Sequence, residues 1–301
     1  MKRSILMIAM LIASVSASAQ FYVSASGGYS FPAADVKFGT ETTTSGVENT
    51  YGSYGEGLHT QLRAGYFFNE KWGVELAGGY LHGSDQTSLL LDVPNQPYVN
   101  VKARGRAYGL SASVIYNIDK NFYGRAGFLT KVGGRTEVVG KVNATLPANL
   151  FNPAAPAGLT TDLTMDLTRD FRGKFPLGFI GAIGYKHKIN ESLSLFAEVE
   201  YMGISVTRDK STIGDFKATL GGNNVTREQL LQMAANTPAL QNGTFGSILP
   251  LINDEITYVD NLTPTEYAET QSNPLARKQL TQNVPYSSVG FNIGITYTFG
   301  K

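Results

Sequence analysis

The stretch SSVGFNIGITYTF, residues 287–299, decides the fold of this chain. Every second residue from Val289 to Phe299 is apolar, and the residues between them are small or polar. A period of two predicts a β-strand with one apolar and one polar face. In a soluble sandwich a second sheet would cover the apolar face. Two aromatic residues near the end of this strand, Tyr297 and Phe299, instead favour a face that contacts lipid.

Seven earlier segments show the same alternation. They span residues 21–31, 58–68, 72–80, 108–116, 122–132, 175–185 and 193–201. Short links rich in Asn and Asp alternate with four links of about 20 to 80 residues, far longer than usual hairpin loops. Short periplasmic turns and long extracellular loops are typical of outer-membrane barrels. The sequence therefore predicts an all-β chain that forms an eight-stranded antiparallel transmembrane up-and-down β-barrel.

Aromatic residues form two groups at different positions along these strands. One group lies toward the short turns and the other toward the long loops, about 8 to 10 strand residues apart, which matches the thickness of a bilayer. A soluble lipocalin-like or sandwich fold, with aromatic residues inside, is the alternative. That fold needs a solvated outer face, whereas the second face here consists mostly of Gly, Ser and Ala. The pattern favours the membrane barrel.

Charged residues within the strands all fall on the polar face. A charge facing lipid near the midplane would cost about 2–4 kcal/mol. Since eight strands enclose a space that side chains nearly fill, we expect these charges to pair and plug the lumen. A selective pore is the alternative, but it would favour an excess of one sign. The residues of the predicted plug are Arg63, Glu75, Arg125, Lys131, Glu198 and Glu200.

Composition excludes several classes of protein. The chain has no cysteine, so it has no disulfide framework and no thiolate metal site. A formal net charge of +1 offers no basic face for nucleic acid. Residues 1–19 carry Lys2 and Arg3, a short apolar run and the cleavage site Ala17-Ser18-Ala19, which predicts a cleaved signal peptide. We expect a mature domain over residues 20–301, with no cofactor and no metal site.

The long loops differ in character. Residues 32–56 are polar, which predicts a mobile, solvated loop, whereas the second and third loops read as hairpins around residues 93–97 and 147–158. In the fourth, residues 207–285, Thr226 and Gln229 predict a helix cap, and Pro264 and Pro274 predict helix starts. Its apolar residues predict either a self-packed subdomain over the barrel mouth or a partner-docking surface. The docking candidates are Leu230, Leu231, Met233, Phe245, Leu251 and Tyr258.

The last strand resembles the carboxy-terminal signal that outer-membrane barrels present to their assembly machinery. The matching residues are Asn292, Gly294, Tyr297 and Phe299, although Gly300 and Lys301 follow the final aromatic residue here. From Gln20 onward the chain resembles the small barrels of the OmpA transmembrane domain and OmpX, in a form that suggests the Bacteroidota. The resemblance implies a bacterial outer-membrane location, contact with lipid and lipopolysaccharide, and insertion by the assembly machinery.

One short motif suggests an enzymatic activity. His82-Gly83-Ser84 resembles the His-x-Ser of lipid A deacylase barrels, but no acidic residue is placed to orient the histidine. We therefore expect a non-enzymatic barrel that stabilises the membrane, adheres to a surface or docks a partner through the fourth loop. A small transport pore or a lipid-modifying enzyme is the alternative.

Overall fold

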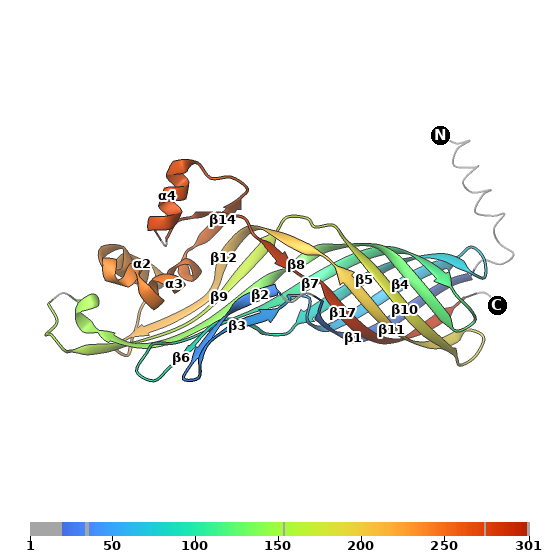
Figure 1. Cartoon of the computed structure of the whole chain (residues 1–301), viewed down its shortest axis with the longest axis horizontal. Coiled ribbons are helices and arrows are strands. Elements are labelled where there is room, and N and C mark those ends of the chain that lie inside the picture. The colour runs from blue at the N-terminus through green and yellow to red at the C-terminus, as the bar shows by residue number, and fades with distance from the viewer. Residues whose placement is uncertain (1–19, 34–35, 153, 274, 300–301) are drawn as a thin grey trace.

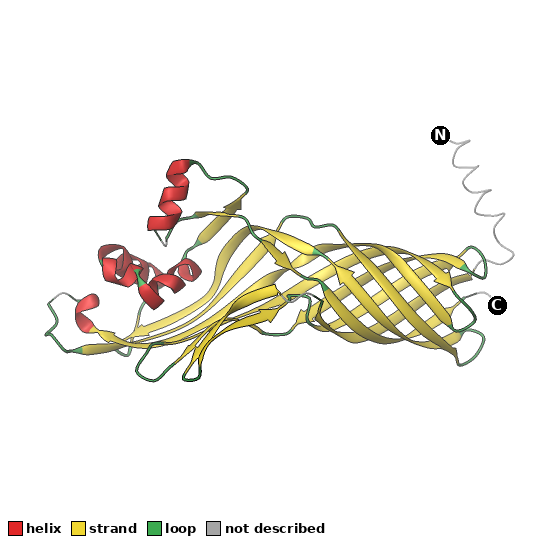
Figure 2. Ribbon diagram, in the orientation of Figure 1, coloured by secondary structure: helices red, strands yellow, loops and turns green. Residues whose placement is uncertain are grey.

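The computed structural model describes residues 20–33, 36–152, 154–273 and 275–299. The predicted signal peptide, Gly300 and Lys301 lie outside the described residues. Strands dominate the described part, where 17 strands are linked by pairing (Figure 2). The prediction of an all-β chain is confirmed.

Eight of these strands form a closed ring of antiparallel pairs. Each strand pairs with the next in chain order among the eight, and the last pairs with the first, with Tyr29 opposite Phe291. Closure leaves no free sheet edge in the ring. The eight strands are β1 (Gln20–Pro32), β4 (Gly57–Phe67), β5 (Trp72–Gly83), β7 (Tyr98–Asn117), β8 (Phe122–Pro147), β10 (Gly178–Lys188), β11 (Leu193–Gly203) and β17 (Ser288–Thr298).

Three short turns join strands at the end of the ring where β1 begins and β17 ends (Figure 1). In the first turn the Asn69 Oδ1 atom accepts hydrogen bonds from the backbone N–H groups of Lys71 and Trp72, at 2.9 and 2.8 Å. Asp119 and Asn190 accept equivalent bonds in the other two turns. These side chains replace backbone partners and fix the predicted tight turns.

The outer face of the ring is apolar and uncovered. Leu62, Leu76 and Ile293 are 71%, 67% and 72% exposed. Aromatic side chains pair at both ends of this surface: the ring centroids of Trp72 and Tyr116 are 4.6 Å apart near the short turns, and those of Tyr80 and Tyr108 are 4.9 Å apart near the long loops. No protein layer covers this surface in the described part of the chain, which disfavours the soluble sandwich.

The long loops continue the sheet beyond the ring, where β7 and β8 run on and pair with each other. The predicted second and third hairpins are confirmed. The prediction of a mobile, solvated first loop is wrong. This loop forms an antiparallel hairpin of β2 and β3, and β2 also pairs in parallel with β6. The added strands are β2 (Val36–Thr43), β3 (Gly46–Gly52), β6 (Gln86–Asp92), β9 (Thr160–Gly173), β12 (Ser205–Leu220), β13 (Asn223–Asn224), β14 (Glu255–Val259), β15 (Lys278–Leu280) and β16 (Asn283–Pro285).

Helices pack on this extended sheet. They are η1 (Ala148–Leu150), α2 (Arg227–Asn236), η2 (Pro238–Gln241), α3 (Gly243–Ile252) and α4 (Pro264–Ser272). The capping box at Thr226 and the start at Pro264 are confirmed. The helix start at Pro274 is not supported: Pro274 lies outside the described residues, and residues 275–277 are not helical because the chain turns there into β15. Among the described helices, none combines the length and apolarity needed to cross a membrane.

A large core joins α2, η2 and α3 to β7, β8, β9 and β12. Leu163, Leu230, Leu249 and Ile252 are fully buried in it, together with Val99. Burying each of these side chains stabilises the packed state by roughly 1.5–3 kcal/mol. The fourth loop therefore folds against the second and third loops instead of extending alone into solvent.

Candidate functional site in the lumen

Inward side chains divide the interior of the ring into layers. The layer nearest the short turns is aromatic and apolar, and each of its four aromatic rings lies opposite a glycine in the strand register. The pairs are Tyr22 with Gly65, Phe67 with Gly73, Tyr123 with Gly184, and Phe196 with Gly294. A Cβ atom at position 294 would lie 2.5 Å from the Phe196 ring. Glycine is therefore required for these rings to lie across the neighbouring strand. The buried layer contains Tyr22, Phe67, Ile115, Tyr123 and Phe196.

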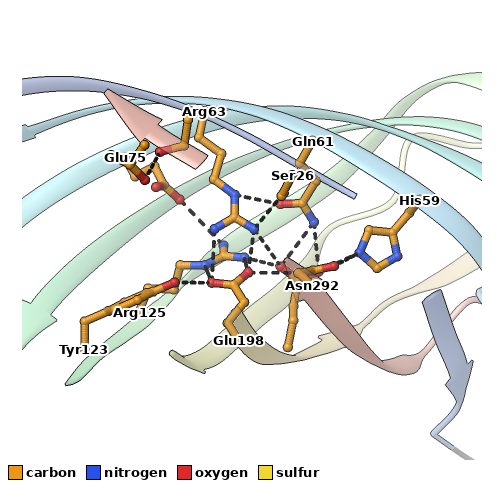
Figure 3. Close-up of polar contacts among 12 residues, drawn as sticks. Ser26, His59, Gln61, Arg63, Glu75, Tyr123, Arg125, Glu198 and Asn292 are labelled. Carbon is orange, nitrogen blue, oxygen red and sulfur yellow. Dashed lines mark hydrogen bonds and ion pairs between the residues drawn. The ribbon is translucent and has the colours of Figure 1, made fainter. Parts of the chain in front are cut away.

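Glu198 is the centre of the next layer, which is ionic (Figure 3). Its carboxylate accepts hydrogen bonds from both terminal nitrogens of Arg63, at 2.5 and 3.1 Å, and from Arg125 at 2.9 Å. The Tyr123 hydroxyl and the Asn292 amide donate to it at 2.8 and 3.1 Å. One carboxylate thus joins strands β4, β8, β11 and β17.

Two further carboxylates border Arg125. Glu200 is paired with the Arg125 guanidinium and accepts hydrogen bonds from Gln61 Nε2 at 2.9 and 3.2 Å. Glu75 lies 3.8 Å from Arg125 and accepts a hydrogen bond from the Tyr22 hydroxyl at 2.9 Å. All three glutamates are at most 5% exposed. A buried charge without a partner is costly, and the surrounding arginine, tyrosine, glutamine and asparagine side chains supply partners to these carboxylates.

Five of the six predicted plug residues meet in this cluster, and Lys131 does not. The Lys131 side chain lies farther toward the long loops, 3.5 Å from the Tyr286 hydroxyl, and forms no ion pair among the described residues. Arg63 and Glu75 are diagonal neighbours in the register of β4 and β5, yet Arg63 binds Glu198 across the lumen.

Sequence reasoning missed the neutral members of the cluster. Tyr22, Gln61 and Tyr123 lie on the polar face of their strands, which was the available signal. His59 also belongs here: its ring hydrogen-bonds the Ser30 hydroxyl at 2.9 Å and contacts the Asn292 side chain. Alternation in the sequence predicts which face of a strand a side chain lies on. It does not predict which strand lies across the lumen from that side chain, so partners across the lumen cannot be predicted from alternation alone.

The predicted assembly signal also has a place in this packing. Asn292 and Gly294 face inward, where one binds Glu198 and the other accommodates Phe196. Tyr297 and Phe299 face outward, each 45% exposed, with their ring centroids 4.9 Å apart. Packing inside the ring therefore constrains Asn292 and Gly294, two of the four residues of the predicted assembly signal.

The predicted docking residues are largely enclosed. Leu230 and Tyr258 are buried, at 0% and 5% exposure, so neither can form a docking surface. Leu231, Met233, Phe245 and Leu251 are partly buried and pack against the same core. This placement favours a self-packed fourth loop over a docking surface made of these residues.

Among the described residues, neither the candidate catalytic pair nor a metal site is formed. His82 and Ser84 form no hydrogen bond with each other among the described residues, and the Ser84 hydroxyl instead contacts the Tyr29 hydroxyl at 3.0 Å. The described part of the chain holds no group of three or more side chains suited to bind a metal ion.

A comparison with known protein families identifies the class. The family model described as outer membrane protein beta-barrel domain matches residues 4–223. No curated protein sequence matches the chain.

Three solved structures overlap most of the chain. Ail from Yersinia pestis has 8% identity and a TM-score of 0.28, covering 93% of this chain and 97% of its own. CarO from Acinetobacter baumannii has 11% identity and a TM-score of 0.27, covering 91% and 97%. The outer membrane protein AlkL has 12% identity and a TM-score of 0.26, covering 94% and 92%. At TM-scores this low, these similarities carry no information about function.

Proposed function

The chain belongs to the outer membrane protein beta-barrel domain family, and on this premise we propose that it is an eight-stranded, non-conducting transmembrane barrel that presents a folded extracellular platform. Its location is the bacterial outer membrane. The observation that carries the proposal is the buried cluster around Glu198, which spans the lumen.

The side chains that fill the lumen support the proposal that it is closed. Eight strands enclose a space just wide enough for side chains, and here an aromatic layer and an ionic layer lie one above the other. Arg63 and Arg125 oppose Glu75, Glu198 and Glu200, and Lys186 lies 5.5 Å from the Phe67 ring in the adjoining layer. The charges therefore nearly balance, whereas a selective pore favours one sign and a continuous water path.

The platform consists of the extended strands and the helices of the fourth loop. Its fully buried core residues and the close packing of α2 and α3 support a single folded body. Such a body suits adhesion to a surface or docking of a partner protein better than a mobile loop does. Outer-membrane lipid, lipopolysaccharide and the assembly machinery are the other partners that we propose.

We include the absence of enzymatic activity in the proposal. The His82 and Ser84 side chains lack the hydrogen bond that a nucleophile needs from its base. Lipid A mass analysis of cells with wild-type protein and with His82→Ala should give identical spectra. A lipid A species that disappears in the variant would contradict this part of the proposal.

Planar bilayer recording tests the closed lumen. Purified wild-type protein should give no discrete conductance steps, while a general porin reconstituted in parallel shows them. Heat-dependent gel mobility verifies that the protein is folded, and protease protection verifies insertion. Reproducible steps from folded, inserted wild-type protein would contradict the proposal.

Cross-linking in native membranes tests docking. A photoreactive side chain at Tyr267, which is 51% exposed on α4, should capture a partner, whereas the same group at buried Leu249 should capture none. If neither position yields an adduct, adhesion or membrane stabilisation is favoured over docking.

A further inference from the structure

A chamber of about 90 Å³ lies inside the ring, beyond the ionic cluster on the side of the long loops. His59 and Gln61 contribute to its floor and Tyr286 to its roof. Tyr286 stacks on Tyr54 at 5.5 Å between ring centroids, and both side chains are 5% exposed. The chamber therefore borders the Glu198 cluster on one side, and Tyr286 and Tyr54 cover it on the side of the long loops.

The walls of the chamber are almost entirely apolar. Leu81, Leu129, Ile180, Met202 and Val206 line it from five different strands. Dry apolar cavities bind small apolar molecules: an engineered cavity of about 150 Å³ lined by such residues binds benzene. A space of the size found here accommodates a chain of a few carbon atoms.

Lys131 brings an ammonium group to this lining. Among the described residues its ammonium group has one hydrogen-bond partner, the Tyr286 hydroxyl at 3.5 Å, and it lies 5.1 Å from the centre of the Tyr286 ring. An ammonium group has three N–H donors, so two of these donors have no hydrogen-bond partner among the described residues. The polar floor offers no substitute, because His59 and Gln61 already bind Ser30, Asn292 and Glu200.

Tyr286 adds a second polar group at the same wall. Its hydroxyl shares a hydrogen bond of 2.6 Å with Thr136 Oγ1. Burial raises the pKa of Tyr286, so this hydroxyl stays protonated at neutral pH and is able to donate to an anion. Lys131 and Tyr286 thus place two donors at one side of an apolar space.

We propose that this chamber binds a small amphipathic monocarboxylate, with the carboxylate at Lys131 and Tyr286 and a short hydrocarbon tail among Leu129, Ile180 and Met202. One cation and one hydroxyl suit a singly charged group. A phosphate, with more charge and more acceptor oxygens, would require further donors. This inference goes beyond the proposed function, which concerns ion flow and the platform.

Fluorine NMR on protein in nanodiscs tests the proposal with two probes of equal length that are short enough for the chamber, 3,3,3-trifluoropropanoate and 3,3,3-trifluoropropan-1-ol. Empty nanodiscs give the partition background. Wild-type protein should bind the carboxylate saturably. Lys131→Met keeps the length of the side chain and should weaken carboxylate binding at least about tenfold, the effect of roughly 1.4 kcal/mol, while leaving alcohol binding unchanged.

Two further variants complete the test. Lys131→Arg should retain carboxylate binding, and Ala107→Phe, which fills the chamber, should abolish binding of both probes. Leu129→Trp serves the same purpose if Ala107→Phe fails to fold, as judged by gel mobility. Binding no greater than in empty nanodiscs, or equal carboxylate binding by wild type and Lys131→Met, would overturn the proposal. Neither result would affect the conductance test of the closed lumen.

Discussion

At the scale of single residues, Glu198 holds the interior together. Four donor side chains from three other strands, β4, β8 and β17, converge on its carboxylate, and Glu198 is 4% exposed. Ion pairs this deeply buried do not necessarily stabilise a fold relative to apolar packing, but removal of one partner is costly because the remaining charges stay buried. Glu198 is therefore the residue at which the interior is most sensitive to change.

Glu198→Ala should lower the free energy of unfolding by about 3–5 kcal/mol, since Arg63 and Arg125 lose their shared acceptor. Denaturant titration of the protein in lipid vesicles, followed by tryptophan fluorescence, measures the loss. Glu191→Ala, which removes an exposed carboxylate in a turn, is the matched control and should be nearly neutral. An equal effect of the two substitutions would contradict the role assigned to Glu198.

At the scale of elements, α3 depends on Arg169. This side chain is fully buried and donates to the carbonyl oxygens of Leu251 and Asn253, at 3.3 and 2.6 Å, and to Ser211 Oγ at 2.9 Å. It therefore binds carbonyl groups at the end of α3 and ties the helix to β12. Burial lowers the pKa of Arg169, yet arginine remains charged at any physiological pH.

Arg169→Leu should release α3 from the sheet without opening the ring, because hydrogen bonds to a charged group contribute about 1.5–3 kcal/mol each. Hydrogen exchange should rise across residues 243–260 and stay unchanged in β1, β4 and β17. Arg172→Leu, at an exposed position on the same strand, is the control. Unchanged exchange over residues 243–260 would show that α3 does not depend on Arg169.

The contrast between α2 and α3 shows what local sequence can predict. The start of α2 follows from Thr226 and Gln229, three residues apart, whose side chains cap each other's backbone. The docking of α3 relies on Arg169, which is 82 residues from one of its acceptors. The hairpin of β2 and β3 is local, but the pairing of β2 with β6 was missed for the same reason, because β6 lies far along the chain.

At the scale of the whole molecule, alternation predicts two faces but not what meets inside. Arg63, Glu75, Arg125, Glu198 and Glu200 could all be assigned to the interior because a lipid-facing charge is costly. Their pairing depends on how the strands are staggered around the ring, and this stagger cannot be predicted from the sequence of a single strand. Lys131 was assigned to the plug only because it lies on the polar face of its strand. Its position along β8 places it in a different layer.

The orientation of β17 tests the central claim most directly, namely that the apolar face meets lipid and the polar face is enclosed. The chain lacks cysteine, so single cysteines at positions 289 to 298 can carry spin labels without other changes. Accessibility to oxygen, which concentrates in lipid, should be high at Phe291, Ile293 and Ile295 and low at Asn292 and Thr296, with water-soluble nickel reagent excluded from both faces. A lack of alternation, or nickel access at Phe291, Ile293 and Ile295, would contradict the account.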